Sequence, residues 1–300
     1  MFSNTKVKAQ TGRTSIRRNA LVEKSLLIGP GLVYAIVFMA MPVLLVLTLT
    51  IFQRGRYGGV VYDATLANFT RALDPLYLEI LRNSIYIAGL TTFLAIAIGY
   101  PTAYAIAQLP KKWRTLVLVL VVLPFLTNFL IRTYAWIILL NSQGPINRAL
   151  TGLGIDPIQV LYTPWAVVAG LLYAYLPLMI LPLYSSIERL DPELREVALN
   201  LGATPFRVFR KITLPLTLPS LITGSVFVFV PSLGNFIVPE LLGGGKTVMV
   251  GNLIRDQFLK ARDWPFGSVL ALVVVLFVIL LFALQSWVGR RISGSAGSHA

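Results

Sequence analysis

The sequence predicts an all-α integral membrane protein with six transmembrane helices and a helical cytoplasmic loop between the fourth and the fifth. Three observations predict this fold. Of the 300 residues, 56% are hydrophobic and only 13% are charged, which is more apolar material than a soluble core can hide. The apolar residues form runs long enough to cross a bilayer, which needs about 20 helical residues. The basic residues gather in short clusters between these runs.

The runs define the expected elements in chain order. Residues 1–24 form a basic tail, residues 25–289 the membrane domain, and residues 290–300 a second tail. The first run is longer than the roughly 7 to 15 apolar residues of a cleaved signal sequence, so we expect it to remain as a helix. Five runs carry no charge and a sixth contains Arg132; they cover residues 25–53, 84–109, 115–140, 163–186, 216–239 and 265–289.

Arg132 needs a separate account, because an arginine inside a bilayer is costly. We expect it to reach the headgroups or to pack on Trp136, one helical turn away. The alternative is that it lines a substrate path.

Charge predicts the orientation. With six spans both termini lie on one side, and 16 of the 26 lysines and arginines fall on that side. Because cytoplasmic loops of membrane proteins are enriched in lysine and arginine, both termini are expected to be cytoplasmic.

The residue inventory excludes several functions. There is no cysteine and the one histidine is His299, which excludes thiol chemistry and histidine-based metal sites. The net charge of +14 lies in loop clusters, so nucleic acid is not an expected partner. The spans hold almost no titratable groups, which argues against a membrane enzyme and against an ion-coupled secondary carrier, although the carrier is kept as the alternative from another class.

Residues 187–215, between the fourth and fifth spans, are expected to form two short helices. Asp191 can cap the first helix and Pro192 suits its first turn. Gly202 is a natural stop, and Thr204 and Pro205 can begin the second helix.

The side chains of this loop suggest a surface for another molecule. Glu193 and Glu196 favour the N-terminal end of the first helix. The second helix is expected to place Phe206, Phe209 and Ile212 on one side. An apolar stripe on the first helix is formed by Leu194, Val197, Ala198 and Leu201. Such a hairpin either lies on the inner leaflet or docks into a groove of a cytoplasmic partner.

A motif in this loop decides between the two. Glu196-Val197-Ala198, Gly202, Ile212 and Leu214-Pro215 stand at spacings that resemble the coupling-loop signature of binding-protein-dependent ABC importer permeases. Valine at position 197 is the one departure, since alanine is usual there. The resemblance implies the type I ABC importer permease fold and an ATPase-coupling surface made of Glu193, Glu196, Val197, Ala198, Gly202, Thr204, Pro205, Phe206, Ile212, Leu214 and Pro215.

Other stretches resemble the spermidine/putrescine branch of these permeases. They are Asn83-Ser84 and residues 130–136, 239–244, 251–254 and 261–267. The resemblance implies a subunit of the bacterial cytoplasmic (inner) membrane that imports a polyamine by alternating access, with opines and phosphonates as alternative solutes.

The same resemblance implies the partners. They are two ATPase subunits, an extracytoplasmic solute-binding protein, membrane lipid and a second homologous permease subunit. That second subunit is expected to be a different chain, while a homodimer stays open. ATP and magnesium belong to the ATPase partner, so no cofactor, metal or catalytic residue is expected in this chain.

A substrate path should show helix breaks and polar groups within the membrane. Pro219, Gly224, Pro231 and Gly234 are expected to interrupt the fifth span, with a hinge at residues 231–235. Candidate path residues are Pro231, Ser232, Asn235, Glu240, Tyr100 and Tyr134, with Glu240 as a weak site for a cation. The alternatives are an architectural proline kink and, for the tyrosines, an interfacial belt.

Overall fold

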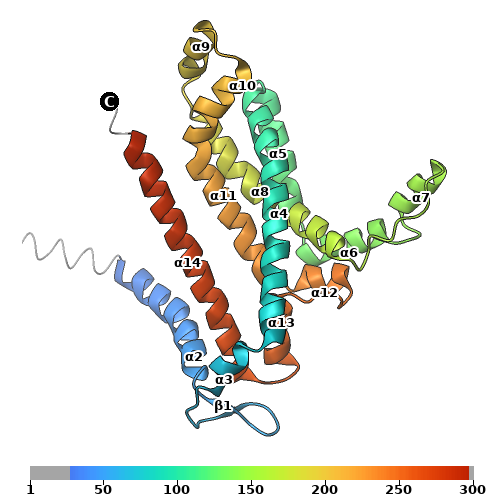
Figure 1. Ribbon diagram of the computed structural model, residues 1–300, viewed down its shortest axis with the longest axis vertical. Coiled ribbons are helices and arrows are strands. Elements are labelled where there is room, and N and C mark those ends of the chain that lie inside the picture. Colours follow the sequence, from blue (N-terminus) through green and yellow to red (C-terminus); the bar gives the residue numbers. More distant parts are fainter. Residues whose placement is uncertain (1–27, 297–300) are drawn as a thin grey trace, which may run out of the picture.

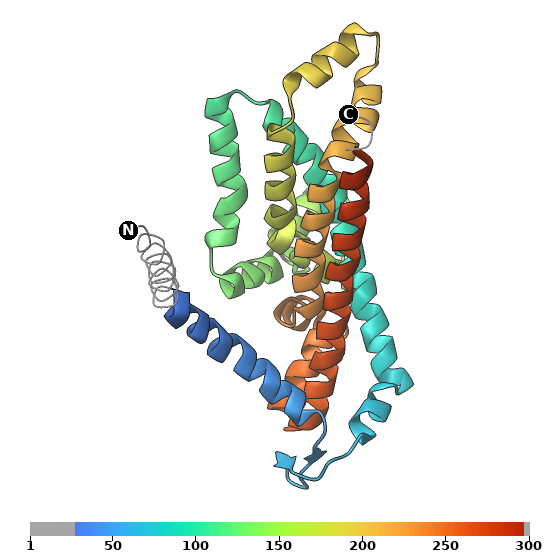
Figure 2. The same cartoon turned by 90° about the vertical axis from the view of Figure 1, so that its left-hand side faces the viewer.

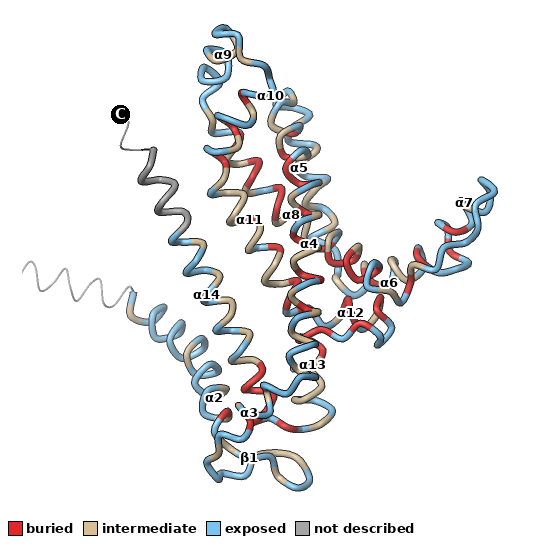
Figure 3. The backbone as a smooth tube through the Cα atoms, in the orientation of Figure 1, coloured by how far each residue is buried: buried red, intermediate tan, exposed pale blue. Residues whose placement is uncertain are grey.

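The computed structural model describes residues 28–296, with side chains described up to residue 287. The predicted N-terminal tail and His299 lie outside the described residues. Three long helices form the centre of the molecule: α4 (Pro75–Gln108), α8 (Pro164–Glu188) and α11 (Leu214–Gly234). Figure 1 shows α14 (Trp264–Ala296) running beside α11. The core lies between the three central helices, since buried residues concentrate along α4, α8 and α11 (Figure 3).

The first helical segment stands apart from this bundle. It covers Ile28–Leu49 and includes the π-helical turn η1 (Ile36–Ala40) and α2 (Met41–Leu49). Its last part, α2, packs against α14, and the segment diverges from the bundle toward its N-terminal end (Figure 2). Its side chains are almost all exposed and apolar. In a membrane such a surface faces lipid or another apolar helix.

The two ends of the bundle carry different structures. At one end, which we call the hairpin end, lie α9 (Pro192–Asn200) and α10 (Pro205–Val208), near the C-terminal end of α14 (Figures 1 and 2). At the opposite end lie α3 (Ala67–Ala72) and two short antiparallel strands, β1 (Gln53–Arg54) and β2 (Val60–Val61). Gln53 pairs with Val61.

Five of the expected spans are present as long apolar helices. The third, over residues 115–140, is not a single helix, so the chain has six spans only if this bent pair is one span. It consists of α5 (Lys111–Leu126) and α6 (Phe129–Leu140), and α7 (Pro145–Gly152) follows. The segment Phe129–Gly152 is bent by 95° relative to α5. Asn128 begins the second half, because its side-chain oxygen accepts hydrogen bonds from the N–H groups of Leu130 and Ile131 at 2.9 and 3.2 Å.

The fifth span also differs from expectation. The turn η2 (Phe209–Thr213) joins α10 to α11, so that the helix runs without interruption over Pro205–Gly234. The expected interruptions at Pro219, Gly224 and Pro231 are therefore wrong, because a proline removes only one helical hydrogen bond and neighbouring helices hold the segment. The chain leaves the helix at residues 235–236 and continues in α12 (Ile237–Gly243) and α13 (Val250–Leu259).

Glycines allow the three central helices to approach closely around Met179 of α8, which is fully buried. A Cβ atom at Gly99 of α4 would lie 2.8 Å from Met179 Cγ, and one at Gly224 of α11 would lie 2.9 Å from Met179 Sδ and 3.4 Å from its main chain. The two glycines therefore leave room for Met179, which explains why Gly224 stands inside an unbroken helix.

This packing predicts that Gly224→Val destabilises the protein, because the added atoms overpack the contact with α8 at a cost of about 1–3 kcal/mol. Gly89→Val is the matched control, since Gly89 is also helical and a Cβ added there would have nothing within 4 Å. The thermal midpoint of the detergent-extracted protein measures both. Equal midpoints for the two variants would contradict the packing role.

Candidate functional site

The hairpin forms with the caps that the sequence predicts. The Asp191 carboxylate accepts a hydrogen bond from the N–H of Glu193 at 2.9 Å. The Thr204 hydroxyl accepts one from the N–H of Arg207 at 3.3 Å. Gly202 has φ +81°, a conformation that glycine adopts without strain. Local chemistry therefore fixes the shape of the hairpin.

Three large apolar side chains of this hairpin are exposed. The exposed fractions of Val197, Leu201 and Phe206 are 56%, 83% and 70%, and Figure 3 shows the hairpin as largely exposed. Of the other residues of the predicted coupling surface, Ala198, Ile212 and Leu214 are half-buried, and Glu193, Glu196, Gly202, Thr204, Pro205 and Pro215 are exposed. Exposed apolar side chains of this size are typical of a docking surface.

The base of the hairpin is anchored to the bundle by aromatic contacts. The ring of Phe209 lies 5.5 Å from that of Tyr100 and 6.0 Å from that of Tyr104, measured between centroids. The Tyr100 hydroxyl is hydrogen-bonded to Thr217 Oγ1 at 2.8 Å. The Phe209 ring also lies 6.5 Å from that of Phe206. Phe206 and Phe209 therefore lie on one side of the second hairpin helix, as expected, with Phe206 exposed and Phe209 packed toward α4. Tyr100 is a buried packing residue at the hairpin base.

At the other end of α11, two asparagine side chains satisfy the main chain where the helix ends. Asn235 donates a hydrogen bond to the Tyr175 hydroxyl at 2.8 Å and accepts one from the N–H of Val238 at 2.9 Å. Asn252 donates one to the Phe236 carbonyl at 2.8 Å. Both asparagines are at least nine-tenths buried. The helix end is thus a fixed structure in which buried polar groups are paired.

The start of α13 fits against this helix end. The Ser84 hydroxyl of α4 accepts a hydrogen bond from the N–H of Val250 at 2.8 Å. A Cβ atom at Gly251 would lie 2.9 Å from the Asn235 carbonyl oxygen, so only glycine fits. Ser84, Gly251 and Asn252 belong to stretches that carry the resemblance to polyamine permeases, and the structure brings them together.

Asp263 belongs to another stretch that carries the resemblance, and its partner Arg71 lies on α3. Its carboxylate is fully buried and pairs with the Arg71 guanidinium at 2.7 Å. It also accepts a hydrogen bond from the N–H of Phe266 at 3.2 Å. The Arg71 guanidinium carbon lies 3.9 Å from the centroid of the Phe266 ring. This ion pair ties α3 to the start of α14.

Glu240 lies on α12 and is not a free carboxylate. Its Oε2 is 3.0 Å from Arg255 Nη2 and 3.3 Å from Asn252 Nδ2. The same guanidinium binds Asp256 Oδ1 at 2.6 Å, and Lys260 Nζ lies 3.0 Å from Asp256 Oδ2. Partial burial raises the pKa of Asp256, but the two cations outweigh it and hold that pKa below its ordinary value.

Arg255 was missed by sequence reasoning. It stands 15 positions after Glu240, and no local pattern connects them; only the packing of α12 and α13 does.

The other candidate path residues lie apart. Pro231 and Ser232 are inside α11, and the Ser232 hydroxyl is buried and bonded to the Val228 carbonyl at 2.7 Å. Tyr134 is exposed on α6. Asn235 lies at the end of α11 and Glu240 on α12, and both lie near Asn252 of α13, which bonds to the Phe236 carbonyl and to Glu240.

Arg132 has different neighbours from those expected. Its Nη1 donates a hydrogen bond to the Pro124 carbonyl at 2.7 Å. Its guanidinium carbon lies 5.3 Å from the Phe129 ring centroid and 5.6 Å from that of Tyr173. The expected contact with Trp136 is replaced, because the bend after Leu126 brings the end of α5 within reach.

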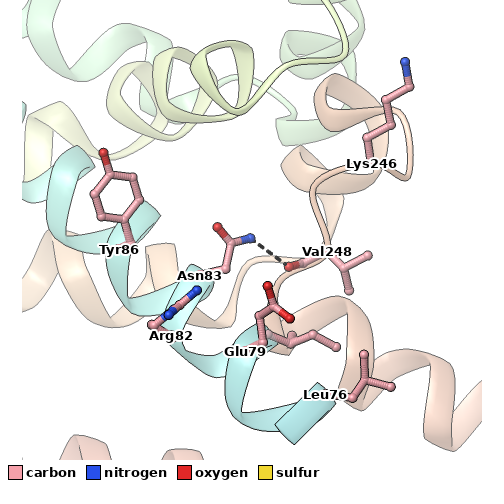
Figure 4. Close-up of a pocket in the computed structure, with 8 residues that line it drawn as sticks. Leu76, Glu79, Arg82, Asn83, Tyr86, Lys246 and Val248 are labelled. Carbon is pink, nitrogen blue, oxygen red and sulfur yellow. Dashed lines mark hydrogen bonds between the residues drawn. The ribbon is translucent and has the colours of Figure 1, made fainter.

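A pocket of about 580 Å³ lies at the end of α4 away from the hairpin (Figure 4). Asn83 donates a hydrogen bond to the Val248 carbonyl at 3.3 Å across it. Its lining consists of Leu76, Glu79, Ile80, Arg82, Asn83, Tyr86, Lys246 and Val248. Two cationic side chains against one carboxylate make the pocket unfavourable for a polycation.

The long apolar helices are those of a membrane-spanning protein. Residues 20–294 match the model of the family described as "Binding-protein-dependent transport system inner membrane component". The chain belongs to this family and is the permease subunit of an ABC importer, integral to the inner membrane.

Individual relatives and a solved structure agree with this family assignment. The chain is 41% identical over 261 residues to the spermidine/putrescine transport system permease protein PotB of Escherichia coli (strain K12), covering 86% of this chain and 94% of the relative. It is 43% identical to PotB of Haemophilus influenzae, covering 83% and 88%. A crystal structure of a bacterial alginate ABC transporter contains a chain of the same fold, with TM-score 0.75, 20% identity and coverage of 93% and 97%.

The contacts of Asn252 yield a stability prediction. Asn252→Ala leaves the Phe236 carbonyl without its side-chain donor, at a cost of about 1–3 kcal/mol. The thermal midpoint of the purified protein should fall. Asn200→Ala, an exposed position on the hairpin, is the control and should leave the midpoint unchanged. A midpoint insensitive to Asn252→Ala would show that this bond is dispensable.

Proposed function

We propose that this chain is the permease subunit of an importer for polyamines such as spermidine and putrescine. The observation that carries the proposal is the 41–43% identity to PotB proteins over 83–86% of the chain. Opines and phosphonates are the alternative solutes. In the proposed assembly an extracytoplasmic binding protein delivers the solute, two ATPase subunits bind ATP and magnesium, and a second, homologous permease subunit completes the membrane pair.

In the proposed orientation both termini and the hairpin are cytoplasmic. The excess of lysine and arginine in the segments of that side supports this. The position of the hairpin near the C-terminal end of α14 is consistent with it (Figure 1). Residues 25–289 then form the permease domain between two cytoplasmic tails.

The hairpin is the proposed contact with the ATPase. Its exposed apolar side chains, Val197, Leu201 and Phe206, suit a groove on a protein partner. Because η2 and α11 continue the second hairpin helix without a break, a displacement of the hairpin would be passed along one helix to Asn235. We propose that this displacement drives alternating access.

Gly202→Val tests the coupling role. The substitution strains a left-handed residue, and it should abolish ATP-driven uptake while membrane insertion persists. Gly154→Val is a matched control, because Gly154 has φ +77° and both glycines have nothing within 4 Å of an added Cβ. Uptake and copurification of the ATPase are measured for both. Equal uptake by the two variants would refute the role of the hairpin.

The substrate is tested by ATP-dependent uptake of radiolabelled spermidine and putrescine into vesicles that carry the assembled complex. Saturable uptake that requires ATP and the binding protein is expected. A complex that hydrolyses ATP but takes up neither polyamine would refute the polyamine assignment, and opines and phosphonates would be tested next in the same vesicles.

A further inference from the structure

The arrangement around Arg255 places one cation between two carboxylates from different helices. Arg255 Nη2 lies 3.0 Å from Glu240 Oε2 on α12 and 2.6 Å from Asp256 Oδ1 on α13. Its guanidinium carbon is 5.5 Å from the centroid of the Phe236 ring. Two anions and an aromatic face are the surroundings that an organic ammonium group also prefers.

The two ion pairs are unequal. Arg255 makes two hydrogen bonds to Asp256, from Nε at 2.8 Å and from Nη2 at 2.6 Å, but only one to Glu240. It can therefore release Glu240 and stay paired with Asp256. The Glu240 side chain is 43% exposed and keeps its hydrogen bond from Asn252. Because a partly exposed ion pair contributes little, exchange of its cation is easy.

We infer that Arg255 is a specificity-determining residue that competes with the ammonium groups of the substrate for Glu240. This inference rests on the proposed function. In the resting state Arg255 neutralises Glu240. A passing primary ammonium, a compact group with three donors, binds Glu240 beside Phe236 while Arg255 remains on Asp256. The return of Arg255 then releases the substrate, so the cation is held only weakly during transit.

The competing explanation is that the ion pair only tethers α12 to α13. The two explanations predict different effects of removing Arg255 on the rate of uptake. If the pair is a tether, removing either partner breaks the same bond and harms uptake equally. If Arg255 is a competitor, removing Glu240 removes the binding group, whereas removing Arg255 leaves that group free.

The experiment measures ATP-driven uptake of radiolabelled spermidine by the assembled complex in vesicles, with saturating loaded binding protein. Glu240→Gln should lower the rate by about 2- to 5-fold. Arg255→Gln should leave the rate equal or raise it, and Arg255→Lys should restore wild-type behaviour. Asp256→Asn should lower the rate, because Arg255 is then held by Glu240 alone.

Lys260→Gln is the matched control. It removes one positive charge from the same cluster, yet Lys260 pairs with Asp256 only, and uptake should stay at the wild-type rate. Equal losses for Glu240→Gln and Arg255→Gln, an Arg255→Gln complex that fails to assemble, or an unaffected Glu240→Gln would each overturn the inference. Absence of polyamine uptake by the wild type would instead refute the proposed function.

Discussion

The end of α11 is the point on which the rest of the structure depends. A helix that stops within or beside a membrane leaves main-chain groups that lipid cannot bind. Here Asn235 bonds to the N–H of Val238, and Asn252 reaches the Phe236 carbonyl from α13. Gly251 allows the close approach, and Ser84 fixes α13 to α4. The groups that satisfy the end of this one helix therefore also hold α12 and α13 in place.

Features set by short-range chemistry could be predicted from the sequence. The lengths of the apolar runs placed five spans, and the residues Asp191, Thr204 and Gly202 placed the ends of the hairpin helices. These predictions succeed because a cap depends on groups two or three positions away. The bend at Asn128 has the same local origin, but a search for long apolar runs does not detect a break between two helices within one run.

The remainder could not be predicted because it depends on contacts between distant segments. Glu240 is an isolated acid in the sequence, and its partner Arg255 becomes visible only when α12 and α13 are packed. Tyr100 was a candidate for the path by residue type, yet its bond to Thr217 places it in the core. Pro231 in isolation predicts a break, but α11, packed against α8 and α4, continues through it to Gly234.

One long helix connects the hairpin, which local chemistry determines, with the contacts around Glu240, which packing determines. The helix over Pro205–Gly234 has 30 residues and is therefore about 45 Å long at about 1.5 Å per residue. It begins with the second helix of the exposed hairpin. Its other end lies at Asn235, next to the contacts that hold Glu240 and Arg255. The prolines lie within the helix and do not divide it, so under the proposed function a movement of the hairpin displaces the far end as well. Under the proposed function, coupling to ATP and control of the substrate path thus act on opposite ends of the same helix.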